Sequence, residues 1–411
     1  MTAQECMSSL GGWKGYVVGT LQRFEAGDKG PAPQVWIVLH RDRVTPMVCG
    51  GCGHATLARH DVEDRWVRDL PIFEARTHLL VQRCRVACPT CGPKLEKLDW
   101  LEPFARVTVR LAQSVARLCA AMPIKQVAGY FGLGWDQVKA IDKGYLGRTL
   151  GEPDLSNLEE IVMDEFAIQK GHRYATVIVE PWCKRVLWVG RGRGREDIRP
   201  FFQKLGPEGC PRLQAVAMDM NGAYEEEVRA WCPQAQIVYD LFHVVAKYGR
   251  EVVDRVRVDQ ANQLRQDRAA RQLLKGSRWL LLKNRENITD PTQRVRLKEL
   301  LAVNQALFKV YVLKDDLKHL WDYTYPAAAR RFWAGWYQRA VRSRIEPLKA
   351  FARKLKGYLP GILSHCRWPL HTSLLEGINN KIKVIKRMAY GYRDDDYFFL
   401  KIRQAYPGDP G

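Results

Sequence analysis

Apolar residues recur at two different spacings along this chain, and the change of spacing divides it into regions. Residues 107–122 are apolar at every third or fourth position, which is typical of one helical face. From residue 158 onward, short runs rich in valine and isoleucine are separated by turns and by two helical stretches. The runs are residues 160–168, 173–181, 185–192, 213–220 and 236–242. Three adjacent strands, then a helix, a strand, a helix and a strand, predict a mixed α/β sheet with a single layered core.

After this sheet pattern the chain returns to helical spacing. Amphipathic helices are predicted within residues 252–283, 291–323 and 326–359. The last of these segments contains Trp333, Trp336 and Tyr337. Aromatic rings can stack on DNA bases, but aromatic residues at helical spacing more often belong to a core. We therefore favour a core position for all three.

Two short helices separated by glycines follow the helical face of residues 107–122. Gly132 and Gly134 interrupt the chain after the first helix, and the second helix begins directly after them. This pattern resembles a helix-turn-helix with residues 135–143 as its recognition helix, although any helical hairpin can show it. If the hairpin binds DNA, Gln137 and Lys139 are expected to face bases or phosphates.

The composition points to an ordered protein with a polyanionic partner. The 411 residues include 13 tryptophans and are 46% hydrophobic, so packed cores are expected. The formal net charge is +20, which favours nucleic acid as the partner, because cations that displace counterions from phosphates add affinity without reading sequence. No apolar run reaches the length of a membrane span, and the first residues lack the pattern of a secretory signal. We expect neither a membrane protein nor a secreted one.

Four of the eleven cysteines form two CxxC pairs, and the others suit reduced thiols of a cytosolic protein. Two such knuckles can complete a closed zinc site with four thiolate ligands. The predicted ligands are Cys49, Cys52, Cys88 and Cys91, and unligated thiols are the alternative. Cys84, His54 and His60 are nearby substitutes, of which Cys84 ranks first. A zinc ribbon of this kind is expected to use the metal as its core, because few residues bury little apolar area.

Two aspartates interrupt apolar strands in the sheet region. Asp164 and Asp219 each follow four mainly apolar residues, and a buried carboxylate is costly unless a cation compensates it. The pair is therefore a candidate metal site. The structural alternative is that each aspartate caps a turn at a strand end. Asp240 is a third possibility, with a stronger alternative as the N-cap of a following helix.

A third acid stands in the segment LLEGINNKIKVIKR, residues 374–387. On a helix, one stripe of this segment is apolar, and the other consists of Glu376, Asn379, Asn380, Lys383 and Arg387. The second stripe would carry its carboxylate at the metal and its cations along a phosphate backbone. Alternatively, Ser373 and Glu376 form a capping box, in which the glutamate reaches back to the N-cap amide. The segment alone leaves these two interpretations equal.

These motifs together resemble the DDE transposases of the ISL-three group of bacterial insertion sequences. The resemblance is carried, in order along the chain, by the cysteine knuckles, the helix-turn-helix, VMDEFAIQKGHRYATVIVE, MDMNGAYEEEVRAWCPQAQIVYDLFHVV and LLEGINNKIKVIKRMAYGYRDDDYF. It implies a ribonuclease H-like core in which Asp164, Asp219 and Glu376 are the catalytic acids. The resemblance also implies a supporting role, without metal binding, for Asp240 and His243.

The expected fold is α/β, with a ribonuclease H-like mixed-sheet catalytic core and an all-helical insertion, preceded by a zinc ribbon and a helix-turn-helix. The expected divisions are an N-terminal segment (1–43), the zinc ribbon (44–95), the helix-turn-helix domain (96–150), the first part of the core (151–250), the helical insertion (251–370) and the second part of the core (371–411).

The resemblance implies a DNA transposase that binds the terminal inverted repeats of an insertion sequence, cuts at them and joins them to target DNA. Carboxylate ligands suit two Mg²⁺ or Mn²⁺ ions, and one structural Zn²⁺ belongs to the ribbon. Lys383 and Arg387 would position the DNA backbone. A homodimer or larger assembly in the bacterial cytoplasm, associated with the nucleoid, is expected. The alternatives are a structure-selective nuclease of the same fold and a non-catalytic DNA-binding regulator.

Overall fold

A computed structural model describes residues 2–169, 171, 173–283, 285–370 and 373–408, with residues 3, 285, 373 and 374 described by their backbone alone. The chain forms two compact units. The first comprises residues 1–151 and 385–405, and the second comprises residues 152–384 and 406–411. In the part of the chain that is described, no helix has the length and apolar character needed to cross a membrane.

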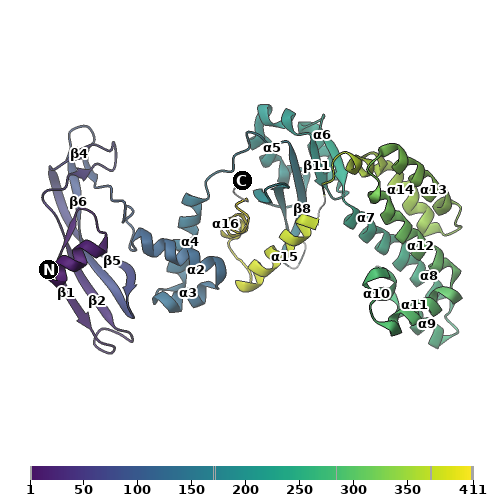
Figure 1. Ribbon diagram of the computed structural model, residues 1–411, viewed down its shortest axis with the longest axis horizontal. Coiled ribbons are helices and arrows are strands. Elements are labelled where there is room, and N and C mark those ends of the chain that lie inside the picture. The colour runs from purple at the N-terminus through teal and green to yellow at the C-terminus, as the bar shows by residue number, and fades with distance from the viewer. Residues whose placement is uncertain (1, 170, 172, 284, 371–372, 409–411) are drawn as a thin grey trace. The chain divides into compact units, whose positions relative to one another are not determined.

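The first unit begins with a short helix, forms a sheet and then continues into further helices (Figure 1). Its strands are β1 (Tyr16–Phe24), β2 (Gln34–Arg41), β3 (Met47–Val48), β4 (Ala55–Thr56), β5 (Arg59–Ile72), β6 (Ala75–Cys88) and β7 (Gly92–Leu95). Its helices are α1 (Ala3–Gly11), α2 (Val109–Ala121), α3 (Ile124–Phe131), α4 (Trp135–Thr149) and α16 (Asp395–Ala405). Helix α15 (Ser373–Met388) crosses from the second unit into the first.

The N-terminal sheet has the order β1-β2-β6-β5, with β7 paired to β6. One face buries an apolar core that includes Ile37, Leu39, Leu79 and Val81. The sequence pattern had suggested a ribbon whose core is the metal, preceded by a separate N-terminal segment. In the structure β1 and β2 extend the sheet of the ribbon strands, and their alternating apolar residues supply a core of its own.

Helices α2, α3 and α4 form the predicted helix-turn-helix. Gly132 ends α3 in the left-handed conformation, at φ 60°, which a glycine adopts without steric cost. Helix α16 packs against α4 within the same unit (Figure 1). Its Lys401 donates to the buried carboxylate of Asp142 on α4 at 3.0 Å, and its Tyr397 hydroxyl donates to the same carboxylate. These contacts explain why residues 385–405 join the first unit, although the sequence pattern grouped residues 371–411 with the core.

The second unit contains a five-stranded mixed sheet in the order β10-β9-β8-β11-β12. Its strands are β8 (Glu160–Gln169), β9 (Arg173–Glu180), β10 (Arg185–Arg191), β11 (Ala215–Met218) and β12 (Gln236–Tyr239). The first three strands are antiparallel neighbours, whereas β8, β11 and β12 run parallel. The sequence pattern predicted all five strands and the mixed character of the sheet. Helices α5 (Arg195–Gly209) and α6 (Gly222–Trp231) provide the connections between β10, β11 and β12.

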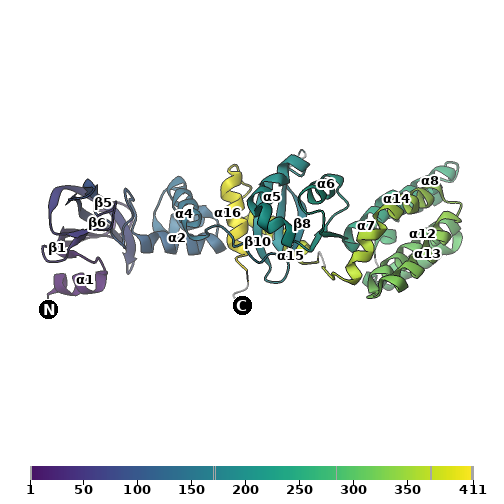
Figure 2. The same cartoon turned by 90° about the horizontal axis from the view of Figure 1, so that it is seen from above.

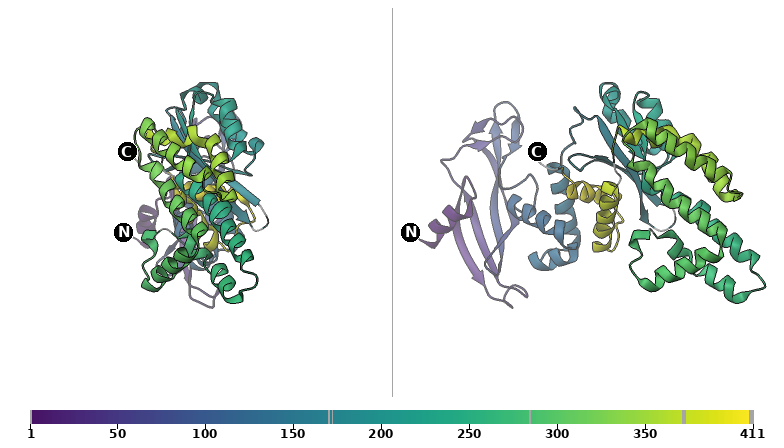
Figure 3. Two further views of the ribbon diagram at one scale, coloured as in Figure 1. Left: turned by 90° about the vertical axis from the view of Figure 1, so that its right-hand side faces the viewer. Right: turned by 45° about the vertical axis from the view of Figure 1, so that its right-hand side comes forward.

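A group of helices follows β12 in the second unit (Figures 2 and 3). These are α7 (Leu241–Tyr248), α8 (Arg255–Gln263), α9 (Arg268–Lys275), α10 (Arg278–Leu282), α11 (Pro291–Val303), α12 (Gln305–Lys318), α13 (Pro326–Val341) and α14 (Glu346–Leu363). A π-helical segment, Gly249–Asp254, joins α7 to α8. Trp333 and Trp336 are buried in the core of this unit, and the Trp336 indole donates to the Leu313 carbonyl at 2.8 Å. The preference for a core position over DNA stacking is confirmed for these two residues.

Candidate functional site

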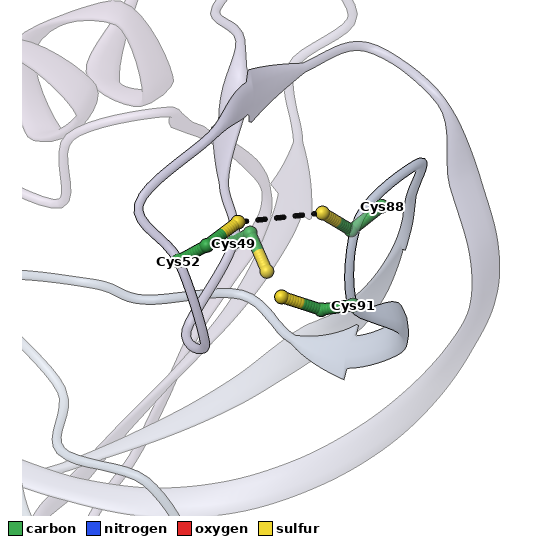
Figure 4. Close-up of side chains that lie close together, drawn as sticks. All are labelled: Cys49, Cys52, Cys88 and Cys91. Atoms are coloured by element: carbon green, nitrogen blue, oxygen red, sulfur yellow. Dashed lines mark hydrogen bonds between the residues drawn. The ribbon is translucent and has the colours of Figure 1, made fainter.

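The four knuckle cysteines meet at one end of the N-terminal sheet (Figure 4). Their sulfur atoms all lie within 4.8 Å of one another, and the Sγ atoms of Cys52 and Cys88 are 3.5 Å apart. The backbone N–H of Gly51 points to Cys49 Sγ at 3.4 Å, so the first knuckle already donates to its own sulfur. Four thiolates at this spacing suit a single tetrahedral zinc ion.

The electrostatics of the cysteine cluster also favour a cation. The backbone N–H of Cys91 lowers the pKa of the Cys88 thiol to about 6. The hydrogen bond with Cys52 raises the pKa of Cys91 to about 12. One thiol of the cluster therefore loses its proton easily, whereas further deprotonation is unfavourable. A bound Zn²⁺ would stabilise all four thiolates. The substitutes do not join the group, since Cys84 is buried in the sheet and His60 contacts Asp61 at 3.0 Å.

The second unit brings the three predicted acids to one cavity of about 630 Å³. Asp164 lies on β8, Asp219 directly after β11, and Glu376 on the first turn of α15. Strands β8 and β11 are parallel, with Ala217 opposite Val162. Continuing this register by two residues brings Asp219 level with Asp164. The same pairing between β11 and β12 places Asp240 level with Asp219, so parallel strands deliver three aspartates to one edge.

Asn379 and His243 hold the two strand aspartates. The side-chain amide of Asn379 donates to Asp164 Oδ2 at 2.7 Å. His243 on α7 lies between the carboxylates, with its Nε2 atom 3.8 Å from Asp164 Oδ1 and its Nδ1 atom 3.6 Å from Asp219 Oδ2. The supporting position expected of His243 therefore has a definite geometry, which bridges the two acids.

Burial raises the pKa of Asp164 to about 6, against the opposing effects of His243 and of hydrogen bonds from Glu165 and Asn379. Two further oxygens at the cavity, Asp240 Oδ2 and Asn379 Oδ1, are buried and have no hydrogen-bond partner among the described residues. Asp240 occupies the N-cap position of α7, but its side chain makes no capping bond. An oxygen-rich set with orphaned atoms fits a hard divalent cation such as Mg²⁺ or Mn²⁺.

Cations form another part of the cavity lining. Lys383 on α15 was expected there, whereas Arg250 and Lys318 were not singled out from the sequence. Arg250 belongs to the π-helical segment, and Lys318 ends α12. The segments after β12 thus supply two cations to the acidic cavity, Lys318 from the predicted helical insertion and Arg250 from the residue just before it. No local pattern marks these two cations, because only the packing of α12 and the π-helical segment brings them to the acids. Lys318, for example, is more than 150 positions away from Asp164 in the sequence.

Glu376 lines the cavity with an exposed side chain. The competing capping-box interpretation depends on the side chain of Ser373, which lies outside the described residues. Arg387 is exposed on the last turn of the same helix. The acid and the two cations of the predicted stripe are therefore all on α15, as the helical spacing required.

Of the two predicted DNA-contacting residues of α4, Lys139 has an ion-pair partner within the first unit. Lys139 Nζ lies 3.1 Å from Asp394 Oδ2, and Lys143 Nζ lies 2.9 Å from the same oxygen. Burial opposes the ionisation of Asp394, but its hydrogen bonds with Lys143, Tyr397 and Lys139 hold its pKa well below the usual range. Gln137 is half-buried and lines a separate cavity of about 600 Å³ beside α2.

Comparison with known protein families identifies the same three regions of the chain. A family model described as a transposase matches residues 161–402. A model for the helix-turn-helix domain of transposase family ISL3 matches residues 96–146, and one for the zinc finger of transposases IS204, IS1001, IS1096 and IS1165 matches residues 45–91.

Two kinds of relatives extend this match along the chain. The transposase for insertion sequence element IS1001 of Bordetella parapertussis is 55% identical over 410 residues, covering 100% of both chains. The transposase for insertion sequence element IS1557 from two strains of Mycobacterium tuberculosis is 28% identical over 397 residues, covering 90% of this chain and 88% of that relative. With a zinc ribbon, a helix-turn-helix and a transposase domain in this order, the chain belongs to the ISL3 family of transposases.

Proposed function

We propose that this transposase cuts and joins DNA with divalent cations held by Asp164, Asp219 and Glu376. The observation that carries the proposal is the convergence of these acids, from β8, the end of β11 and α15, on one cavity. The mixed sheet order, with parallel β8, β11 and β12 presenting the aspartates at one edge, supports a ribonuclease H-like core. Membership of a transposase family is consistent with cutting and joining of DNA.

The chain's own residues prepare the reaction in three ways. Asn379 binds one oxygen of Asp164, and the other oxygen accepts from the Glu165 N–H and lies 3.8 Å from His243 Nε2. His243 separates the two carboxylates and reduces their repulsion when it is protonated. Lys383, Arg250 and Lys318 bind phosphates next to the scissile bond. Two Mg²⁺ or Mn²⁺ ions, when bound, activate a water or 3′-hydroxyl nucleophile and stabilise the leaving oxygen.

The first unit would recognise the terminal inverted repeats of the insertion sequence through its helix-turn-helix, with the zinc ribbon as a rigid support. The family match supports DNA binding by this part of the chain. Two ends have to be held together for transposition, so we propose that the working form is a homodimer or a larger assembly.

The test is a strand-transfer assay with duplexes that carry the terminal repeat, in Mg²⁺ and with zinc-loaded protein. Wild type is expected to cleave at the repeat and to join the freed 3′-hydroxyl to target DNA. Cleavage without joining would indicate a structure-selective nuclease. DNA binding that persists with no cleavage in wild type, and with no difference for Asp164→Asn, would indicate a DNA-binding regulator and contradict the proposal.

A further inference from the structure

The N-terminal sheet has a second face, opposite its apolar core, that carries aromatic and cationic side chains. Strand pairing sets same-face residues side by side across β2, β6 and β5. The rows are Gln34 beside Arg76, then Trp36 beside His78 and Arg68, then Val38 beside Leu80 and Trp66. Residues of the alternate positions, such as Ile37 and Leu79, form the core instead. We call this second face the sheet platform.

The cationic end of the sheet platform meets the turn of the helix-turn-helix. Arg68 donates to the carbonyls of Phe131 at 3.0 Å and Gly132 at 3.4 Å, at the end of α3. The Arg76 guanidinium lies against Gly132, where any side chain would collide with it. Both arginines are therefore adjacent to the turn that precedes the recognition helix, within one compact unit.

These cations have no acidic partner among the described residues. The Nε atom of Arg68 is buried without a hydrogen-bond partner, and the Arg76 guanidinium makes no hydrogen bond or ion pair in the described part of the chain. Burial and then the charge of Arg76 lower the pKa of Arg68. Burial, Arg68 and Arg76 lower the pKa of His78 to about 4. Positive charge is thus concentrated here without compensation, which favours an anionic partner.

An aromatic surface continues from the cations. The ring centroids of Trp36 and Trp66 are 5.0 Å apart, with an angle of 63° between the ring planes. The ring centroid of Phe24 lies 4.9 Å from that of Trp36. Trp66 is 47% exposed, so the surface is open. Uncompensated arginines beside exposed aromatic rings fit nucleic acid, which offers phosphates and apolar sugar and base surfaces together. An isologous contact with a second copy would instead bring these like charges toward one another.

We infer that the sheet platform binds the backbone of duplex DNA next to the segment held by the helix-turn-helix. Arg76 takes a phosphate, Arg68 adds positive charge from its position against the α3 carbonyls, and Trp66 packs against the sugar edge. This inference rests on the DNA-binding part of the proposed function and adds a second contact surface to it. The bound site would accordingly be longer than the helix-turn-helix alone can cover.

The experiment measures binding of the full zinc-loaded protein to a labelled terminal-repeat duplex by fluorescence anisotropy, at several salt concentrations and without Mg²⁺. Arg76→Ala is expected to weaken binding about tenfold, as the loss of one charge-assisted contact to phosphate does. The negative slope of log K against log salt should become shallower by about 0.9, because one phosphate contact is lost. Arg76→Lys should keep that slope, and Trp66→Ala should weaken binding with the slope unchanged.

The matched control is Arg23→Ala, which removes an exposed arginine of the same sheet that is already bound to Glu25 and Glu74. Its affinity and salt slope should equal those of wild type. Thermal unfolding of each variant verifies that the first unit is intact. Equal affinity and slope for Arg76→Ala and wild type would overturn the inference, as would a Trp66→Ala variant that loses self-association but not DNA affinity. A wild type that does not bind the terminal repeat would instead contradict the proposed function.

Discussion

The cysteine cluster and the acidic cavity are both suited to metal ions, but the first is closed and the second is open. The four cysteine sulfurs lie within 4.8 Å of one another, which no other group of three or more potential ligands does among the described residues. Asp164, Asp219 and Glu376 instead line a cavity of about 630 Å³ together with an imidazole, an amide and cations. Closure suits a structural ion with no free position, whereas an open site leaves room for a substrate.

The difference follows from how each site is supported. The cysteines are held by tight glycine-containing knuckles at the end of a sheet with its own apolar core. The acids come from a strand, a strand end and a helix separated by an insertion of more than a hundred residues. His243 and the hydrogen bond from Asn379 favour the ionised form of Asp164, and a bound cation would favour it further. We therefore expect the two sites to respond differently to mutation and to metal removal.

The largest effect should come from the acids. Asp164→Asn should reduce strand cleavage and strand transfer roughly 10³-fold or more, about 4 kcal/mol of transition-state stabilisation, because the ligand charge is lost. DNA binding by the first unit should remain unchanged, and a gel assay of cleavage beside an anisotropy assay of binding measures both. The exposed acid Glu196, replaced by Gln, is the control. Equal activity of Asp164→Asn and wild type would remove the cavity from the reaction.

Loss of one thiolate should damage the closed site but leave the open one intact. Cys52→Ser should weaken zinc binding roughly 10²-fold or more, because structural zinc affinity depends on the complete ligand set. Zinc content by mass spectrometry, with Cys6→Ser as the control, measures this. Since the sheet has a separate apolar core, β1, β2, β5 and β6 should stay folded while DNA binding falls. Global unfolding of the variant would show that the metal is the true core of this region.

Asn379→Ala should make the open site less ordered. It removes the hydrogen bond to Asp164 and one of the influences that lower the pKa of this carboxyl. Affinity for Mn²⁺ should fall about tenfold, a typical cost when a supporting hydrogen bond to a ligand is lost. Titration calorimetry measures it, and Lys381→Ala, an exposed change on the same helix, is the control. Unchanged Mn²⁺ affinity would mean that Asp164 needs no such support.

The smallest effect concerns Lys139 and Lys143 of α4, which are already paired with Asp394. Asp394→Asn should release Lys139 and Lys143 while keeping a side chain that caps α16. Affinity for duplex DNA should rise about threefold, in line with the modest free energy of partly exposed ion pairs. Anisotropy with terminal-repeat and unrelated duplexes measures the gain. A loss of affinity would show that Asp394 orients these lysines for DNA instead of competing with it.

Much of this architecture could be predicted because its signals are local. Cysteine spacing identified the zinc knuckles, and polar interruptions of apolar runs identified Asp164 and Asp219. Strands β1 and β2 were missed, since β2 joins the sheet through β6, which lies beyond a turn-rich segment, and β1 joins it only through β2. Asn379, Arg250 and Lys318 were not assigned to the site, and the pairing of Lys139 with Asp394 was not foreseen. Each of these depends on tertiary packing between distant segments, which no periodicity within one segment encodes.

The most direct test of the acidic cavity is the position of Mn²⁺ in crystals of the zinc-loaded protein, located by anomalous scattering at the manganese edge. The account predicts manganese bound by Asp164, Asp219 and Glu376, and zinc at the four cysteines. Full occupancy of the cysteine site with no manganese at the three acids, at concentrations that sustain DNA cleavage, would contradict it.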